Sequence, residues 1–374
     1  MNQSPIKLFF IAGEPSGDLH GGALIKAIKH YHPNSSFMGH GGDSMKKAGM
    51  QILEHSDTLS IMGFFEVLKH LPRMIKIMDK TISAIKRVKP DRIILIDYPG
   101  FNLRLAKRIK HLNIPITYFI LPQAWAWKEN RVQMMQSLID QSLSILPFEQ
   151  NWFEQRGLTT NYVGHPFSEE YHVNETSKDF YQRHNLSYDD PILLLLPGSR
   201  QQEIDQHWPI FIKTIDKLKT KFSNLQIIVG QAPNVQIFPL PDNIKVEQDS
   251  RKAMVVATAA LVSSGTATLE CAVEDTPLVV CYKLSGLSWA LAKQQIKVNY
   301  VSLVNIIGDK NIVPEVLQKK MTVHNLCNAI SPLLNEKSNE RKIMLSGFEE
   351  VRKSLGVPGV YKRAAEAIIG RTIK

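Results

Sequence analysis

Short runs of consecutive apolar residues recur along the 374-residue chain, and segments with apolar positions at helical spacing lie between them. Uninterrupted apolar runs are typical of strands that are buried on both faces, and their alternation with helices predicts parallel α/β sheets. In the first half, the predicted elements are strands over 6–12, 92–96, 114–120 and 142–146 and a helix over about 19–30. In the second half, they are strands over 192–196, 226–229, 261–262 and 278–281 and helices near 322–335, 338–355 and 359–371.

A polar stretch over 168–190 separates the two sets of strands and is predicted to be a linker. Because the chain is too long for one typical core, we expect two domains, over 1–168 and 169–340. The helices of 341–374 are expected to pack back on the first domain, from the same subunit or a partner. The predicted fold class is therefore α/β, with two Rossmann-like domains whose parallel sheets face a ligand cleft at the carboxyl ends of their strands.

Composition and charge limit the classes of protein to which the chain can belong. An apolar content of 44% with 21% charged residues describes a globular protein. No uninterrupted apolar run is long enough to span a bilayer, and the first strand begins without a signal-peptide pattern, so a cytoplasmic protein is expected. Three isolated cysteines, Cys271, Cys281 and Cys327, are expected to pack in the core of a protein from a reducing compartment.

The net charge of +10 is concentrated in the first half, where residues 1–168 carry 20 Lys and Arg against 13 Asp and Glu. This excess predicts an anionic partner, and nucleic acid, an anionic membrane surface and a phosphorylated substrate all satisfy it. No aromatic-interleaved basic groove, helix-turn-helix or RNA-recognition pattern accompanies the charge, so nucleic acid is not expected.

The segment 261–282 combines a strand, a turn of small residues and a helix start. The turn contains Ser263, Ser264, Gly265 and Thr266. The first turn of a helix has unpaired N–H groups and a partial positive charge, so a phosphate can bind there, and glycine lets the anion approach the backbone. Glu270 follows one helical turn later, where a carboxylate can accept the hydroxyls of a ribose. The alternative is an ordinary helix start with Thr266 near the N-cap.

A second turn of this kind follows the strand over 192–196. It contains Ser199 and Arg200, and an Arg at such a position can give a phosphate two parallel hydrogen bonds. Two phosphate-facing turns in one domain predict a nucleotide diphosphate site. The chain has no GxxxxGK[ST] loop, which argues against a P-loop nucleotidase, and no DxD, so no metal-held sugar nucleotide is indicated. No metal or cofactor is predicted.

The first domain offers carboxylates and a histidine at strand ends. Glu14, Ser16, Asp18 and His20 follow the first strand, in a loop that is not a GxGxxG fingerprint; Ser16 and Asp18 have helix capping as an alternative role. Asp97 follows the strand over 92–96, where partial burial would tune its basicity. Capping is less convincing there, because Pro99 and Gly100 interrupt an immediate helix, so we favour a functional Asp97.

Residues 59–80 form a different kind of candidate site. Phe64, Leu68, Leu71 and Ile75 recur at helical spacing, while Lys69, Arg73, Lys76 and Lys80 follow another face. An apolar face bordered by cations suits a helix in the headgroup region of an anionic membrane, and Gly63 and Pro72 are expected to break the segment. A core helix with solvated lysines is the alternative. The candidate membrane residues are Phe64, Phe65, Leu68, Lys69, Leu71, Arg73, Ile75 and Lys76.

Eight strings along the chain resemble the lipid-A-disaccharide synthase family, in that family's order. They are AGEPSGDLHGG (12–22), IDYPGFN (96–102), LPQAWAWKENRV (121–132), LPFEQNWF (146–153), VGHP (163–166), LLPGSRQQEI (195–204), SSGTATLECA (263–272) and KVNYVSLVNII (297–307). The resemblance implies a metal-independent GT-B glycosyltransferase at the cytoplasmic face of the inner membrane. Such an enzyme joins UDP-2,3-diacylglucosamine to 2,3-diacylglucosamine 1-phosphate, giving a β-1,6 disaccharide and UDP. Pro15 and Pro99–Gly100 depart from the family pattern.

On this interpretation the reaction is an inverting displacement, and Asp97 is the first choice for the base that deprotonates the acceptor 6-hydroxyl. His20 and Glu14 are the alternatives. The second domain holds the donor: Arg200 and the N–H groups after Ser264 would stabilise the leaving diphosphate, and Glu270 would hold the ribose. Asn305 is expected to orient phosphate or sugar, and Gln123 and Trp125 to contact the acceptor, with packing as the alternative role of Trp125.

Two other functions are compatible with these motifs. One is a GT-B transferase or epimerase that uses UDP-N-acetylglucosamine with a soluble or polyprenyl acceptor, and the other is a basic nucleotide-binding regulator. The residues of 59–80 favour acyl-chain substrates over both. The resemblance is also compatible with a homodimer in which the helical tail after about 340 is exchanged between subunits.

Overall fold

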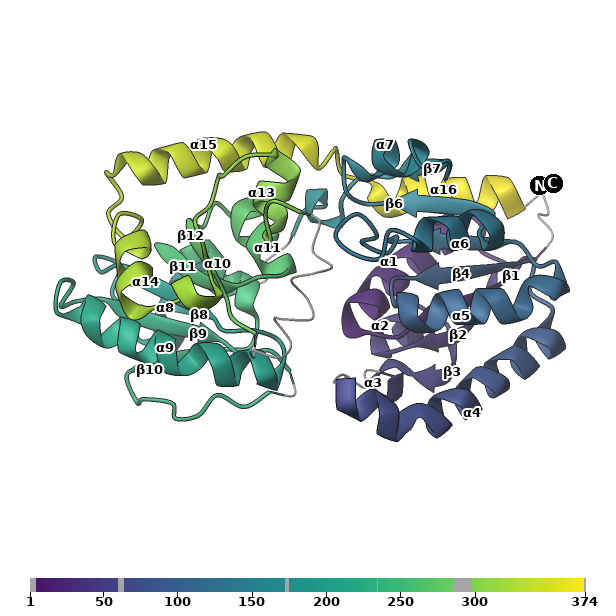
Figure 1. Cartoon of the computed structure of the whole chain (residues 1–374), viewed down its shortest axis with the longest axis horizontal. Helices are drawn as coiled ribbons and strands as arrows, with labels where there is room; N and C mark the ends of the chain where they lie inside the picture. The colour runs from purple at the N-terminus through teal and green to yellow at the C-terminus, as the bar shows by residue number, and fades with distance from the viewer. Residues whose placement is uncertain (1–4, 60–63, 172–174, 234, 285–297, 373–374) are drawn as a thin grey trace. The chain divides into compact units, whose positions relative to one another are not determined.

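The computed structural model describes residues 5–59, 64–171, 175–233, 235–284 and 298–372, with the backbone alone over 64–71. The chain divides into two compact units (Figure 1). Unit 1 comprises Met1–Glu169 with Gly356–Lys374, and unit 2 comprises Glu170–Leu355. The chain therefore passes from one unit to the other twice.

Unit 1 contains a parallel sheet of seven strands in the order β3-β2-β1-β4-β5-β6-β7. The strands are β1 (Lys7–Ala12), β2 (Ser36–Gly41), β3 (Gln51–His55), β4 (Arg92–Ile96), β5 (Ile116–Phe119), β6 (Gln141–Ser144) and β7 (Thr160–Tyr162). The helices are α1 (Pro15–Tyr31), α2 (Asp43–Lys47), α3 (Ser56–Leu59), α4 (Phe64–Val88), α5 (Pro99–Ile109), α6 (Arg131–Leu138), α7 (Glu149–Glu154) and α16 (Val360–Thr372), with single 3₁₀ turns at Lys110–Leu112 and Pro166–Ser168.

Alternate residues of the central strands enter two separate apolar cores, one on each face of the sheet. On β1, Phe9 and Ile11 pack into a core that is closed by α4, α5 and α6. Leu8 and Phe10 face the other way and pack against α1 and α16. Because both faces are covered, β1 after Lys7 and β4 after Arg92 are apolar without interruption, as buried parallel strands are expected to be.

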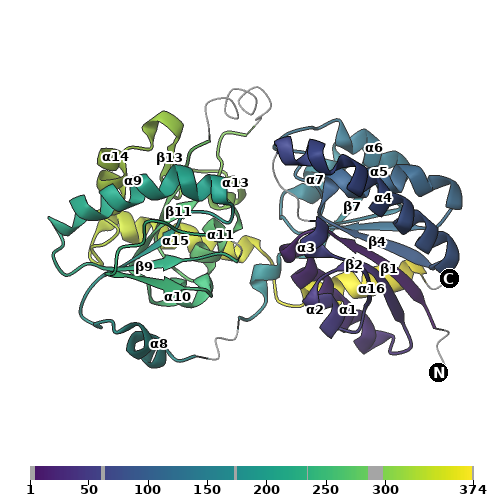
Figure 2. The same ribbon diagram turned by 90° about the horizontal axis from the view of Figure 1, so that it is seen from below.

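Helix α16 belongs to unit 1 although it follows unit 2 in sequence. In Figures 1 and 2 this yellow helix lies among the purple and blue elements of unit 1, and its Val360, Ala364, Ala365 and Ile368 are part of the same core as α1. The buried guanidinium of Arg92 in β4 donates to the Thr372 hydroxyl and the Arg371 carbonyl. These contacts fasten the last helix to the central strand of the sheet.

Unit 2 contains a parallel sheet of six strands in the order β10-β9-β8-β11-β12-β13. The strands are β8 (Ile192–Leu196), β9 (Gln226–Gly230), β10 (Ile244–Glu247), β11 (Ala259–Ser263), β12 (Leu278–Tyr282) and β13 (Glu315–Leu317). The helices are α8 (Ser177–His184), α9 (Gln201–Lys219), α10 (Ser250–Val256), α11 (Thr266–Val273), α13 (Leu303–Gly308), α14 (Val323–Ile330) and α15 (Asn339–Ser354), with a 3₁₀ turn at Gln318–Lys320.

Two parallel sheets flanked by helices confirm the predicted α/β architecture, and all three cysteines are buried and unpaired, as expected for core residues. Three local predictions were wrong. Pro99 and Gly100 begin α5 and do not interrupt a helix, α4 continues through Pro72 to Val88, and residues 341–374 are divided, with α15 in unit 2 and α16 in unit 1. The predicted linker holds the boundary between the units, after Glu169, and also contains α8. Proline is tolerated in α4 at the cost of one backbone hydrogen bond.

Candidate functional site

The turn between β4 and α5 holds Asp97 in a strained backbone conformation. Asp97 and Tyr98 have φ angles of 42° and 47°, the left-handed region that side chains other than glycine rarely adopt. The Asp97 carbonyl accepts hydrogen bonds of 2.7 Å from the hydroxyl of buried Tyr118 and from the side-chain amide of buried Asn102. Strain of this kind persists only where the surroundings enforce it, and it is concentrated at functional sites.

The Asp97 carboxyl is partly buried, and burial raises its pKa to about 6. The negative charge of Glu14 raises the pKa further, while the guanidinium of Arg131 lowers it. Glu14 is at the carboxyl end of the neighbouring strand β1, so the parallel sheet brings these two predicted residues together. A carboxyl with a pKa just below neutrality is ionised at pH 7 and is a stronger base than an ordinary aspartate.

Gly13 makes the close approach of these two strand ends possible. A Cβ atom at Gly13 would lie 2.3 Å from the ring of Tyr98, which is much closer than atoms can pack. The Tyr98 hydroxyl donates to the Leu59 carbonyl at 3.0 Å, so the ring is held over Gly13. The glycine at this position is thus explained by packing of the β4–α5 turn.

The other candidates of the first loop differ in role. His20 shares a hydrogen bond of 2.8 Å with the Tyr361 hydroxyl of α16, and burial lowers its pKa to about 4, so it is a weaker base than Asp97. Asp18 is a cap, but of another helix: its carboxylate accepts from the backbone N–H groups of Gly42, Ser44 and Met45 at the start of α2. Ser16 is exposed in the first turn of α1.

Of the two predicted acceptor contacts after β5, only Gln123 is exposed. Trp125 is 6% exposed, and its indole N–H donates to the carboxylate of Glu149 at 3.0 Å. Glu149 is itself buried, and burial raises its pKa to about 7. The alternative role of Trp125 in packing therefore fits this geometry better than a ligand contact.

In unit 2, the turn after β11 has the geometry that anion binding requires. Gly265 has an extended φ of 163°, and a Cβ atom there would meet no described atom within 4 Å, so the space beside it is open. Thr266 is exposed at the start of α11, and the Ser264 hydroxyl donates to the Val301 carbonyl at 3.0 Å, which fixes the turn. The first N–H groups of a helix lack partners within the helix, so the start of α11 can bind an anion.

Glu270 lies on α11 and is half-buried, and burial raises the pKa of its carboxyl. Nearby Arg251 lowers this pKa but forms its ion pair with Glu274, at 2.6 Å. In the part of the chain that the structure describes, no hydrogen bond is made to the Glu270 carboxylate. It is therefore placed to accept hydroxyl groups of a ligand.

In the turn after β8, a hydrogen bond holds the backbone, whereas the arginine side chain is exposed to solvent. The Ser199 N–H donates to the Glu203 carboxylate at 3.1 Å, and Gly198 has a φ of 138° that strongly favours glycine. The Arg200 side chain is 55% exposed, with its guanidinium 3.8 Å from Glu203. A surface ion pair of this length is weak, so the guanidinium remains available to a ligand.

His207 joins the turns that follow β8 and β12, and sequence reasoning missed it. Its Nδ1 lies 2.7 Å from the Pro197 carbonyl and its Nε2 lies 3.0 Å from the Lys283 N–H. A carbonyl can only accept and an N–H can only donate, so the ring must be neutral with its proton on Nδ1. Burial lowers the pKa of His207 and preserves that state.

The hydrogen bonds of Asn305 favour a structural role over the ligand contact that we predicted. Its side-chain amide donates to the Val313 carbonyl and to Glu315, and its oxygen accepts from the N–H groups of Ile312 and Val313. The amide is fully buried and all four of its hydrogen bonds are used. Asn305 therefore supports the loop before β13, and this argues against direct contact with a phosphate or sugar.

Five of the candidate membrane residues, Phe64, Phe65, Leu68, Lys69 and Leu71, have side chains outside the described part of the structure. The other three lie on α4: Arg73 and Lys76 are exposed, and Ile75 is 52% exposed between them. Farther along α4, Ile82 is on the same helical face but is buried in the core. Among the described residues, no helix combines the length and the apolar composition that crossing a bilayer requires.

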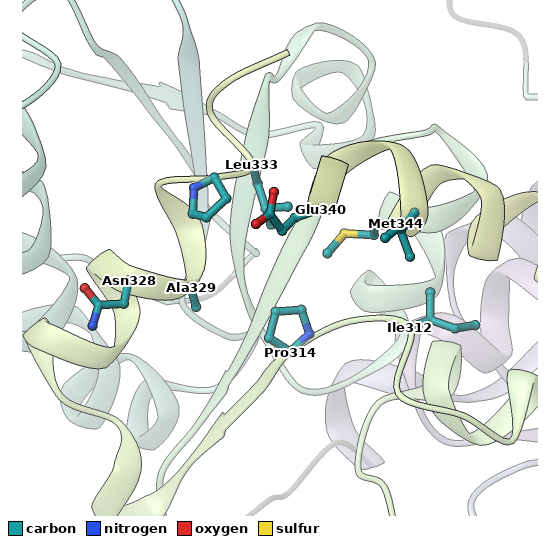
Figure 3. Close-up of a pocket in the computed structure, with 9 residues that line it drawn as sticks. Ile312, Pro314, Asn328, Ala329, Leu333, Glu340 and Met344 are labelled. Atoms are coloured by element: carbon teal, nitrogen blue, oxygen red, sulfur yellow. The ribbon is translucent and has the colours of Figure 1, made fainter. Parts of the chain in front are cut away.

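A pocket of about 350 Å³ lies elsewhere in unit 2 (Figure 3). Ile312, Pro314, Leu333, Ile343 and Met344 supply most of its lining. Pro314 immediately precedes β13, so the pocket is at the amino ends of the strands. The turns with Arg200 and Gly265 are at the opposite edge of the sheet, and the pocket is therefore separate from the candidate site.

Comparison with known proteins connects this geometry to a family. A family model described as lipid-A-disaccharide synthetase matches residues 8–367. The lipid-A-disaccharide synthase of Myxococcus xanthus is 35% identical, covering 98% of this chain and 97% of its own. That of Rhodospirillum centenum is 36% identical, covering 98% of this chain and 94% of its own.

Solved structures identify the fold. A kitacinnamycin glycosyltransferase superposes with a TM-score of 0.65 at 13% identity, over 100% of both chains. A UDP-N-acetylglucosamine 2-epimerase from Neisseria meningitidis superposes with a TM-score of 0.61 at 11% identity, over 99% of both chains. These likenesses confirm the predicted GT-B fold of two Rossmann-like domains, and the family match covers nearly the whole chain. The chain belongs to the lipid-A-disaccharide synthetase family of hexosyltransferases.

Proposed function

We propose that this enzyme transfers the sugar of UDP-2,3-diacylglucosamine to the 6-hydroxyl of 2,3-diacylglucosamine 1-phosphate, with inversion, to give the β-1,6 disaccharide 1-phosphate and UDP. The observation that carries the chemistry is Asp97, a carboxylate at the carboxyl end of β4 whose pKa burial raises to about 6. It combines an ionised state at neutral pH with the basicity that proton abstraction requires.

In the proposed step, the Asp97 carboxylate takes the proton of the acceptor hydroxyl as its oxygen attacks the anomeric carbon from the face opposite UDP. The new C–O bond forms while the bond to the β-phosphate breaks, and UDP leaves with the electron pair. Asp97 is preferred to His20, because the lower pKa of His20, about 4, makes it the weaker proton acceptor. Glu14 remains the alternative base, and its charge has a second role in raising the pKa of Asp97.

The two turns of unit 2 are assigned to UDP. The first N–H groups of α11 and the Arg200 guanidinium would stabilise the charge that develops on the leaving diphosphate. Glu270, which lies on α11 after that turn, would accept the ribose hydroxyls. Ser199 and Thr266 complete the two phosphate-facing turns.

The test of this function is UDP release from UDP-2,3-diacylglucosamine, measured with and without 2,3-diacylglucosamine 1-phosphate. We expect release that depends on the acceptor and a disaccharide product whose new linkage is β by NMR. Release of UDP from UDP-N-acetylglucosamine, or its epimerisation without any acceptor, would instead support the other nucleotide-sugar enzymes of this fold.

Arg200→Gln and Gly265→Ala are each expected to weaken UDP binding roughly tenfold or more, the cost of losing a charge-assisted hydrogen bond. Gly265 already has an extended backbone and open space beside it, so the added methyl group obstructs the anion and does not strain the fold. Calorimetric titration with UDP gives the affinity. Lys213→Gln and Gly370→Ala, at exposed positions, are the controls; unchanged affinity in both test variants would remove these turns from the site.

We also propose that the N-terminal part of α4 rests on an anionic membrane surface. Phe64→Ser with Leu68→Ser and Ile75→Ser is expected to abolish flotation with anionic liposomes, whereas the unaltered protein floats. Of these three residues, only Ile75 has a described side chain. It is 52% exposed and close in sequence to the exposed Arg73, and an exposed apolar side chain bordered by cations is typical of a helix that binds a membrane surface. Ile343→Ser with Val357→Ser, at apolar positions that are 64% and 69% exposed, is the control. Equal flotation of all three proteins would contradict the membrane assignment.

A further inference from the structure

A group of cations surrounds one exposed aromatic ring in unit 1. Trp127 is 40% exposed in the loop between β5 and α6. The Lys128 ammonium lies 4.5 Å from the centre of its ring, and the Arg131 guanidinium carbon lies 4.9 Å from it. Burial lowers the pKa of Lys128, and the charges of Arg131 and of Arg104, on α5, lower it further. We call Trp127, Lys128, Arg131 and Arg104 the Trp127 cluster.

Among the described residues, the cations of the Trp127 cluster form no ion pair. Glu129, the carboxylate nearest in sequence, forms its ion pair with Arg156 at 2.7 Å. In the described ranges of the chain, no ion pair and no side-chain hydrogen bond is made by Lys128, Arg131 or Arg104. The Trp127 ring attracts Lys128 and Arg131, but the like charges of the cluster repel one another, and an anion bound among them would relieve that repulsion.

The backbone also brings Lys128 and Arg131 together. Lys128 has a φ of 60°, a left-handed conformation that lysine rarely adopts. Its carbonyl accepts from the Arg131 N–H at 3.0 Å, and Arg131 then begins α6. The turn therefore fixes both cations on the side of the loop that carries the Trp127 ring.

The Trp127 cluster is electrically coupled to the candidate base. The Arg131 charge acts directly on the Asp97 carboxyl and on the Tyr118 hydroxyl that holds the Asp97 carbonyl. An anion at the cluster therefore lies within electrostatic range of the proton-accepting group. In 2,3-diacylglucosamine 1-phosphate, the carbon that bears phosphate and the carbon that bears the 6-hydroxymethyl group are both bonded to the ring oxygen. The phosphate and the reacting hydroxyl are therefore carried by the two ring carbons on either side of the ring oxygen, and they lie close together.

We propose that Lys128 and Arg131, which lie over the Trp127 ring, bind the phosphate monoester of the acceptor and so place its 6-hydroxyl at Asp97. This assignment rests on the proposed function and adds the part of the site that selects a phosphorylated acceptor. Arginine and lysine are the residues that recognise phosphate, and the Trp127 ring holds both of them beside it. The dianionic phosphate would also offset the effect of Arg131 on Asp97, so the base becomes stronger when the correct acceptor is bound.

The experiment compares two acceptors, with and without the 1-phosphate, in two proteins, the unaltered enzyme and Lys128→Gln with Arg131→Gln. Assays near pH 8 keep Asp97 ionised in both proteins. For the unaltered enzyme, we expect removal of the phosphate to lower kcat/KM about ten- to a hundredfold, the range for a lost charge-assisted hydrogen bond. For the variant, the phosphorylated acceptor should already show that loss, and removing the phosphate should cost less than about threefold more. KM for the UDP-sugar should stay unchanged.

Lys107→Gln with Lys110→Gln is the control, because it removes the same charge from exposed positions of the same unit. Lys128→Gln alone, at an exposed side chain, should show a smaller loss of discrimination between the two acceptors, and thermal unfolding confirms that each variant is folded.

If removal of the phosphate lowers kcat/KM as much in Lys128→Gln with Arg131→Gln as in the unaltered enzyme, the proposal is overturned. If the variant also fails to float with anionic vesicles, the cluster binds lipid headgroups instead. Failure of the unaltered enzyme to form any disaccharide would reject the proposed function itself, which is a different result.

Discussion

Asp97→Asn is expected to lower kcat by about two to four orders of magnitude while UDP affinity stays unchanged, because the amide fills the same space but cannot accept the proton. The fold should survive, since the hydrogen bonds from Tyr118 and Asn102 go to the Asp97 carbonyl and not to its side chain. Asp79→Asn, at an exposed ion pair with Arg108, is the matched control. Near-normal turnover in Asp97→Asn would show that another residue is the base.

The pH dependence gives a second measure of the same assignment. The base must be ionised, so kcat/KM is expected to fall as the pH decreases through about 6, the raised pKa of Asp97. Glu14→Gln removes a negative charge that raises this pKa, and its acidic limb should therefore move to lower pH with activity retained. Collapse of activity at every pH in Glu14→Gln would make Glu14 the base instead.

Removal of residues 356–374 is expected to unfold unit 1 and leave unit 2 folded. Val360 and Ile368 are fully buried, and their transfer to water costs roughly 3–6 kcal/mol together, a large part of the 5–15 kcal/mol that stabilises a typical domain. The truncation also leaves the buried Arg92 guanidinium without its partners on Arg371 and Thr372. Limited proteolysis should degrade the sheet of unit 1 and spare that of unit 2.

Single substitutions in α16 measure how much individual side chains contribute to the stability of unit 1. Ile368→Ala should destabilise unit 1 by about 2–5 kcal/mol, the cost of a cavity in a packed core. Glu366→Ala, at an exposed position two residues away, should change its stability by less than about 0.5 kcal/mol. Denaturant unfolding that spares unit 1 in Ile368→Ala would show that the helix is not part of its core.

The strands that the sequence predicted best are those buried on both faces. Arg92–Ile96 and Ile192–Leu196 have the predicted bounds, because the apolar runs in them leave little alternative to a central parallel strand. The strands β2, β3, β7, β10 and β13 were missed, since polar residues, glycine or their short length leave no apolar run in them. A strand end could therefore be located, and with it Asp97 and the turns at Arg200 and Gly265.

Side-chain partners could not be predicted in the same way. The sequence alone does not show whether an amide such as Asn305 binds a ligand or holds a loop. The positions of Val313 and Glu315, which accept its hydrogen bonds, distinguish the two roles. The role of His207 likewise depends on Pro197 and Lys283, which are far apart in sequence. The helical pattern of 359–371 predicts a helix, but the pattern contains nothing about which sheet it covers.

The late return of the chain to unit 1 has a consequence for biosynthesis. Domains are generally expected to fold in the order in which they leave the ribosome, amino-terminal domain first. Here unit 1 supplies the first 169 residues but lacks α16, which covers one face of its sheet together with α1, until that helix emerges after all of unit 2. During synthesis of unit 2, the core that contains Leu8, Phe10 and Ile94 includes α1 but still lacks the side chains of α16. The carboxyl-terminal unit can therefore complete its fold first, and the nascent chain is most exposed to aggregation and chaperone binding just before its last helix is released.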